Sequence, residues 1–101
     1  MELRPGTRLR SAVCSSEVVV VRVGEATVDL RCGGHPMLAV PSDEPVPGLA
    51  VVDTSGTLLG KRYHHDRTGL EVLCTKAGVG GLSVGSEAMV VAAAKPLPSS
   101  D

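Results

Sequence analysis

Residues 17–32 read EVVVVRVGEATVDLRC, and this stretch decides the fold class. Two valine-rich runs flank Gly24-Glu25, and a two-residue loop that begins with glycine is typical of a type II′ turn between paired strands. Over residues 26–32 apolar and polar residues alternate, as in a strand with one buried face. The stretch therefore predicts a β-hairpin of residues 17–23 and 26–32.

Short apolar runs between turn residues continue along the chain, which has 12 Gly and 7 Pro. A second hairpin is expected around Gly85-Ser86, with a helix over residues 86–95 as the competing prediction. The match between residues 23–26 and 84–88 is too short to establish a repeat. We expect one all-β domain over residues 1–95, a small barrel or sandwich of about six or seven short, mostly antiparallel strands, followed by a flexible tail, 96–101.

The composition limits the classes of function. Of 101 residues, 43% are hydrophobic and Tyr63 is the single aromatic residue, so no stacking platform for nucleic-acid bases is expected. The net charge of −1 gives no broad basic surface for nucleic acid or membrane. No apolar run is long enough to cross a bilayer, and the N-terminus lacks a secretory signal. We expect a cytoplasmic protein, and the absence of Ile, Phe and Asn points to a small bacterial protein from a GC-rich genome.

The cysteines offer the clearest candidates for chemistry. Cys32 and His35 have a Cys-x-x-His spacing, with two glycines between them that allow a tight turn. With Cys14 and Cys74 they would complete a Cys3His set for zinc or iron, which would support a core without large aromatic side chains. The competing interpretation is that the thiols are buried and inert, as cysteine often is in protein cores. On either interpretation we expect Cys32 and Cys74 to be buried.

A polar cluster at residues 63–67 is expected in a loop between two strands. His64 and His65 would point to opposite faces of an extended chain, so they cannot easily bind one metal ion together. One of them could serve as a general base oriented by Asp66, because imidazole titrates near neutral pH. The alternative is a charged surface loop without a catalytic role.

Two further motifs are incomplete. Residues 53–56, Asp-Thr-Ser-Gly, resemble the Asp-Thr-Gly triplet of retropepsin-like aspartic proteases, but serine replaces the glycine on which that tight turn depends. Residues 78–81, Gly-Val-Gly-Gly, lack the lysine and the helix of a phosphate-binding loop. We therefore interpret the first as a turn and the second as a flexible connection.

These observations favour a non-catalytic accessory or binding module that acts through protein–protein contacts. The alternatives are a zinc or iron protein with the Cys3His set and a small thiol-dependent enzyme that pairs a cysteine with His64 or His65. We also expect a homo-oligomer, most simply a dimer, because residues 18–21 place apolar side chains on both faces of one strand. The hairpin that contains this strand is expected at or near the dimer interface.

Overall fold

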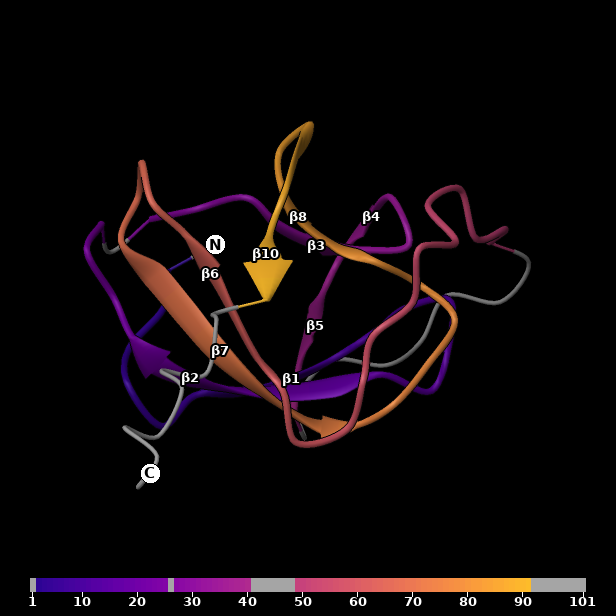
Figure 1. Ribbon diagram of the computed structural model, residues 1–101, viewed down its shortest axis with the longest axis horizontal. Helices are drawn as coiled ribbons and strands as arrows, with labels where there is room; N and C mark the ends of the chain where they lie inside the picture. The colour runs from indigo at the N-terminus through magenta and orange to yellow at the C-terminus, as the bar shows by residue number, and fades with distance from the viewer. Residues whose placement is uncertain (1, 26, 41–48, 92–101) are drawn as a thin grey trace, which may run out of the picture.

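The computed structural model describes residues 2–25, 27–40 and 49–91, which form an all-β fold without a helix (Figure 1). A six-stranded and a four-stranded antiparallel sheet are arranged as in a sandwich and do not close into a barrel. Stiff valine side chains favour the pleated backbone of these strands. The strands are β1 (Arg8–Arg10), β2 (Glu17–Arg22), β3 (Leu30–Cys32), β4 (His35–Pro36), β5 (Leu38–Ala39), β6 (Arg62–His65), β7 (Leu70–Lys76), β8 (Leu82–Val84), β9 (Glu87–Ala88) and β10 (Val90–Val91).

The chain changes sheet at two buried methionines. Met37 separates β4, in the four-stranded sheet, from β5, in the six-stranded sheet, and Met89 separates β9 from β10 in the same way. The Met37 N–H donates to the Leu30 carbonyl (3.1 Å), and the Met89 N–H donates to the Leu82 carbonyl (2.9 Å). Each change of sheet divides one extended segment into two strands, which accounts for two of the ten strands that the described residues form, where six or seven were predicted.

The strand order reveals an approximate two-fold repeat. The strand orders are β10-β6-β7-β2-β1-β5 and β4-β3-β8-β9. If β1–β5 are exchanged with β6–β10, each sheet keeps the same strand order, read from its other edge. The registers agree: Val19 pairs with Leu73 at the centre of the larger sheet, and Arg31 pairs with Ser83 in the smaller one. The two halves of the chain are therefore equivalent five-stranded units that share both sheets.

Turns outside the strands repeat in the same way. The Gly6 N–H donates to the Val20 carbonyl (2.7 Å), and the equivalent Gly60 N–H donates to the Cys74 carbonyl (2.9 Å). Both glycines have positive φ, +90° and +80°, a conformation that favours glycine. The sequence keeps a trace of the repeat, because Leu-x-x-Gly-x-x-x-Met occurs at residues 30–37 and again at 82–89.

The all-β prediction is confirmed, as is the hairpin at Gly85-Ser86, which joins β8 to β9 with Gly85 at φ +59°. The competing helix prediction is wrong over residues 86–91, because these residues form β9 and β10. Residues 92–95 and the predicted tail, 96–101, lie outside the described residues.

The hairpin predicted within residues 17–32 is wrong. β2 pairs with β1 and β7, whereas β3 lies in the other sheet and pairs with β4 and β8. Gly24 does not have the positive φ that the first central residue of a type II′ turn requires. Instead, the Glu25 N–H donates to the Thr68 carbonyl (2.9 Å), so the chain after β2 runs against the turn between β6 and β7.

The four valines of β2 are divided between the core and the surface. Val18 and Val20 are buried among the core side chains, whereas Val19 is half-buried and Val21 is 37% exposed. A second subunit is therefore not needed to bury Val18 and Val20. Self-association stays a prediction, and its interface has to be sought on surfaces that are more exposed than this strand.

We predict that Gly24→Ala destabilises the protein by about 1–3 kcal/mol, the usual cost of overpacking. A Cβ atom at Gly24 would overlap the Thr68 carbonyl oxygen and lie 2.9 Å from Gly69 Cα, so backbone would have to move. Urea denaturation followed by circular dichroism measures the change. The exposed neighbour provides the control, because Glu25→Ala should cost less than about 0.5 kcal/mol. Equal stability of the two variants would contradict this close approach.

Candidate functional site

Two of the three cysteines lie side by side. Cys14 is in the loop between β1 and β2, Cys32 is the last residue of β3, and their Sγ atoms are 3.9 Å apart. Because β1 and β2 belong to the six-stranded sheet and β3 to the four-stranded sheet, the pair bridges the two layers. Cys14 is half-buried and Cys32 is fully buried, so the two thiols differ in access to solvent.

Two buried serines support the Cys14 sulfur. Ser11 Oγ accepts hydrogen bonds from the N–H groups of Val13 and Cys14, both at 3.1 Å, which holds the loop in place. Ser16 Oγ lies 3.3 Å from Cys14 Sγ. Because a hydroxyl both donates and accepts, Ser16 can accept from the thiol and donate to the thiolate.

Two glycines of the facing segment leave room for the sulfur atoms. A Cβ atom at Gly78 would lie 2.2 Å from Ser16 Oγ and 2.9 Å from Cys14 Sγ, and one at Gly80 would lie 2.9 Å from the Gly33 nitrogen and 3.1 Å from Cys32 Sγ. The Gly80 carbonyl accepts hydrogen bonds from the Cys32 thiol (3.6 Å) and from the buried Thr57 hydroxyl. The glycine-rich stretch that the sequence indicated as a connection is thus one wall of the thiol pair.

The two thiols differ in acidity. Burial raises the pKa of Cys14, but hydrogen bonds from Ser11, Ser16 and the backbone outweigh it and lower this pKa from 9.0 to about 7. Burial raises the pKa of Cys32 to about 11, and the charge of a Cys14 thiolate acts in the same direction. Near neutral pH, Cys14 therefore has a large thiolate population and Cys32 remains a thiol.

We expect the alkylation rate of Cys14 by iodoacetamide to follow its thiolate population. The rate should level off above about pH 8 and fall about tenfold per pH unit below about pH 6, because the thiolate is the nucleophile. Mass spectrometry of peptides from protein quenched at successive times measures the rate at each cysteine. Cys74 is the internal control: burial raises its pKa, so its rate should still be rising where that of Cys14 is level. Parallel profiles for the two cysteines would contradict the prediction.

The four predicted zinc or iron ligands are not gathered into one site. His35 Nε2 lies 2.8 Å from the Ala50 carbonyl oxygen, and the Cys74 thiol donates to the Lys76 carbonyl (3.2 Å). Within residues 2–25, 27–40 and 49–91, no group of three or more His, Cys, Asp or Glu side chains is placed to hold a metal ion. Cys14 and Cys32 are the part of the predicted set that the structure brings together. The predicted burial of Cys32 and Cys74 is confirmed.

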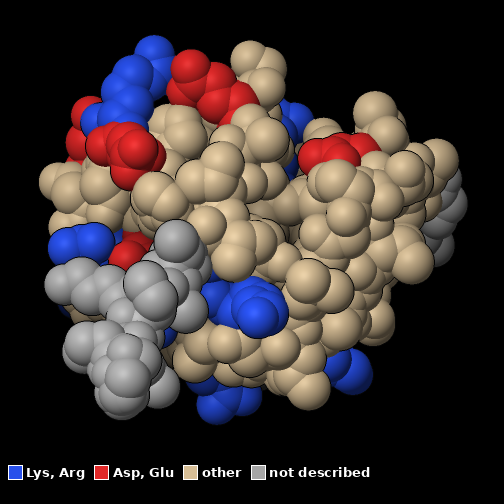
Figure 2. All heavy atoms as spheres, viewed as in Figure 1, with Lys and Arg blue, Asp and Glu red and all other residues tan. Residues whose placement is uncertain are grey.

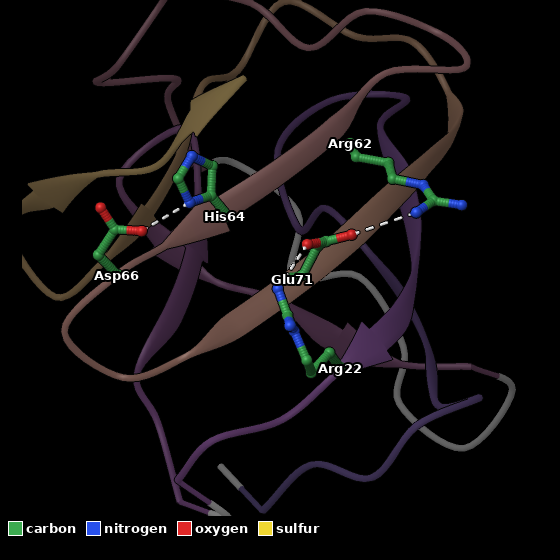
Figure 3. A network of polar contacts seen from close by, with 5 residues as sticks. All are labelled: Arg22, Arg62, His64, Asp66 and Glu71. Atoms are coloured by element: carbon green, nitrogen blue, oxygen red, sulfur yellow. Dashed lines mark hydrogen bonds and ion pairs between the residues drawn. The ribbon is translucent and has the colours of Figure 1, made fainter. Parts of the chain in front are cut away.

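The polar cluster predicted in a loop is divided between a strand and a turn, because residues 63–65 belong to β6 and the turn to β7 begins at Asp66. His64 Nδ1 lies 2.8 Å from Asp66 Oδ1, and Figure 3 shows this pair on the same sheet as Glu71, whose carboxylate lies between Arg22 (3.2 Å) and Arg62 (3.5 Å). These side chains make a network of exposed and half-buried ion pairs on one face. Such pairs each contribute little to stability, because water and salt screen them.

His65 points into the protein and not toward Asp66. Its Nδ1 atom lies 2.8 Å from Thr68 Oγ1, and its Nε2 atom lies 2.8 Å from Glu87 Oε1 of β9. The hydrogen bond with His65 and the charge of Arg67 hold the pKa of Glu87 below its usual value. This buried imidazole therefore ties the β6–β7 turn to the smaller sheet.

The histidines and the thiol pair lie at opposite ends of the six-stranded sheet. The turn at residues 66–69 is beside the last residue of β2, Arg22, which pairs with Glu71, whereas the Cys14 loop leads into the first residue, Glu17, which pairs with Lys76. The thiol-enzyme alternative required a cysteine beside His64 or His65. The fold separates the Cys14–Cys32 pair from both histidines.

Several residues of both clusters were not predicted to contribute to a site. They are Ser11, Ser16, Gly78 and Gly80 around the thiols, and Thr68 and Glu87 around His65. Serine three residues before Cys14 is the one local signal, because a hydroxyl often caps the N–H group three residues on. The others are brought together by strand pairing over long sequence separations.

Comparison with known proteins supplies no identity: no family model, curated protein or solved structure matches the chain. The described residues also contain no helix that is long and apolar enough to cross a membrane. The function is therefore argued from the geometry.

Proposed function

We propose that the chain is a non-catalytic binding module that works through protein–protein contacts, with a second copy of the chain as its partner. The supporting observation is an exposed apolar surface, which we define as the side chains of Val52 (75% exposed), Leu58 (58%), Leu59 (66%) and Val79 (60%). The segment 49–60 contains one charged residue, Asp53. Exposed apolar side chains concentrated in one segment are typical of interaction sites.

The apolar surface draws on two segments that are far apart in sequence. An antiparallel β-bridge between Thr57 and Gly78 joins these segments, with Leu58 one residue after Thr57 and Val79 one residue after Gly78. The space-filling view in Figure 2 shows charged side chains gathered at the upper left and in smaller groups elsewhere, with broad uncharged areas between them.

The two-fold repeat indicates that the fold does not require these leucines. The turn before β6 matches the turn before β1: the Lys61 N–H donates to the Leu58 carbonyl (3.2 Å), and the Thr7 N–H donates to the Arg4 carbonyl (3.0 Å). Leu58 and Leu59 thus occupy the places that Arg4 and Pro5 hold in the first half. Because the same turn forms with a charged residue in the first half, folding does not account for the two leucines. Burial against a partner explains them better.

Leu58→Arg tests the proposal, because arginine is the residue at the equivalent position of the first half, Arg4. Light scattering should give the wild-type protein twice the chain mass of 10.3 kDa at micromolar concentration. The variant should dimerise at least about tenfold more weakly, as expected for a truncated or charged residue at the centre of an interface. The melting temperature of the variant should be close to that of the wild-type protein when the wild-type value is extrapolated to low concentration, where the dimer has dissociated.

Thr75→Arg, which adds the same charge at an exposed position of β7, is the matched control and should leave dimerisation unchanged. A monomeric wild-type protein would overturn the choice of partner. Equal weakening by both variants would show a general charge effect and overturn the proposed surface.

A further inference from the structure

The Cys14–Cys32 pair takes no part in the proposed apolar surface, and its two sulfur atoms lie close to each other. The Sγ atoms are 3.9 Å apart, against about 2.05 Å in a disulfide bond. The difference is within the range that side-chain rotation and a small loop movement can cover. Closing the bond would link the loop before β2 to the end of β3.

The two-fold repeat shows that the fold itself does not demand these thiols. Gly78, which packs on Cys14, corresponds to Gly24, which packs on Thr68 in the turn between β6 and β7. Thr68 takes the place of Cys14, and Val84, at the end of β8, takes the place of Cys32. The same loop and strand end therefore form elsewhere in the chain without sulfur.

The pair is reachable from one side. Cys14 lines a surface hollow of about 290 Å³ together with Arg10, Ser11, Ser16 and Lys76, whereas Cys32 lies fully buried behind it. A small molecule in this hollow meets Cys14 first. Ser16, within hydrogen-bond reach of Cys14 Sγ, is placed to stabilise the attacking sulfur as a thiolate.

We propose that Cys14 and Cys32 form a thiol–disulfide exchange site that reacts with low-molecular-weight disulfides and closes to an intramolecular disulfide. The Cys14 thiolate attacks one sulfur of the disulfide RSSR, which forms the Cys14–SR bond and releases RS⁻. Cys32 then loses its proton and attacks Cys14 Sγ as a thiolate, which forms the Cys14–Cys32 bond and releases the second RS⁻. The two thiol protons pass to the released RS⁻ groups. The protein loses two electrons, and RSSR is reduced to two RSH.

The test is incubation of the reduced protein with millimolar oxidised glutathione, followed by alkylation and mass spectrometry. The number of free thiols should fall from three to one, with the loss of two hydrogens and no retained glutathione. Peptide mapping should find the Cys14–Cys32 link and leave Cys74 alkylated. Three free thiols at the end, or a link that includes Cys74, would overturn the proposal.

Single substitutions assign the order of the two steps. Cys32→Ser should keep one glutathione on Cys14, and Cys14→Ser should react at least about tenfold more slowly, because its remaining pair member is a buried thiol. Cys74→Ser is the matched control and should still lose two thiols. The two single variants can be compared by the rate at which glutathione attaches to the remaining member of the pair. Equal rates would overturn the assignment of Cys14 as the cysteine that reacts first. The peptide map of the wild-type protein decides the question for any variant that fails to fold.

Discussion

Leu30→Ala will lower the free energy of unfolding by about 2–5 kcal/mol, a large share of the about 5–15 kcal/mol typical of a domain. Leu30 is 0% exposed, lies in β3 at the centre of the smaller sheet, and packs in the single core cluster between the sheets. With no Trp or Phe and one Tyr in the chain, few side chains are large enough to fill the space it would leave. Urea denaturation followed by circular dichroism measures the loss.

The repeat supplies a matched variant and the surface supplies a control. Leu82, the equivalent residue in β8, is also buried, so Leu82→Ala should cost a similar amount. Leu59→Ala removes the same atoms from a position that is exposed in the monomer, so at a protein concentration low enough to keep the chain monomeric it should change stability by less than about 0.5 kcal/mol. Similar losses for Leu30→Ala and Leu59→Ala would contradict the assignment of the core.

Two separate chains, residues 1–48 and 49–101, will each be unfolded and will assemble into the native fold when mixed. The central strand pairs of both sheets, β2–β7 and β3–β8, join one half of the chain to the other. Each half alone would expose the core faces of its strands and the hydrogen-bonding edges of β2 and β3, so neither can bury enough apolar surface to fold. Circular dichroism and light scattering of the mixture should show a β spectrum and a one-to-one complex.

A second division of the chain controls for chance association. Cutting between Leu73 and Cys74 divides β7, which pairs with β2 along most of its length, so these fragments should reassemble at least about tenfold more weakly. A folded monomer from either half alone would show that the two halves do not depend on each other. That result would contradict the prediction.

The fold class was predictable because it depends on local properties. Valine-rich runs between glycine and proline residues favour strands in any context, and the hairpin around Gly85 needs only a short-range turn. The partner of β2 was not predictable in this way. Gly24-Glu25 has the composition of a type II′ turn, but β2 gains more from its long pairing with β7 than from a hairpin with β3.

The repeat illustrates the same limit. The sequence match between residues 23–26 and 84–88 was local and joins positions that are not equivalent, because Gly24 corresponds to Gly78. The true equivalence, Leu30 with Leu82 and Met37 with Met89, is carried by three shared residues in eight. It becomes evident when the strand registers and the backbone hydrogen bonds are compared.

The candidate site was predictable in its residue types and not in its assembly. The sequence singled out Cys14, Cys32, His35 and Cys74, and the structure places the first two 3.9 Å apart while His35 and Cys74 contact backbone carbonyls elsewhere. Spacing along the chain suggested the Cys32–His35 pair, and β3 and β4 do pair these residues along the backbone, but the His35 side chain contacts the Ala50 carbonyl. The thiol that meets Cys32 is that of Cys14, a loop residue 18 positions away in sequence.

The sequence by itself determined the strand-rich backbone, the turn at Gly85 and the burial of Cys32 and Cys74, because these follow from side-chain shape, glycine conformation and alternating polarity within a few residues. Only the tertiary structure decided that β2 lies against β7, that the chain changes sheet at two methionines, and that Cys14 meets Cys32 beside Gly78 and Gly80. Those outcomes depend on which strands bury the most apolar surface together while pairing their backbone groups. That balance is summed over both sheets, so no short stretch of the sequence contains it.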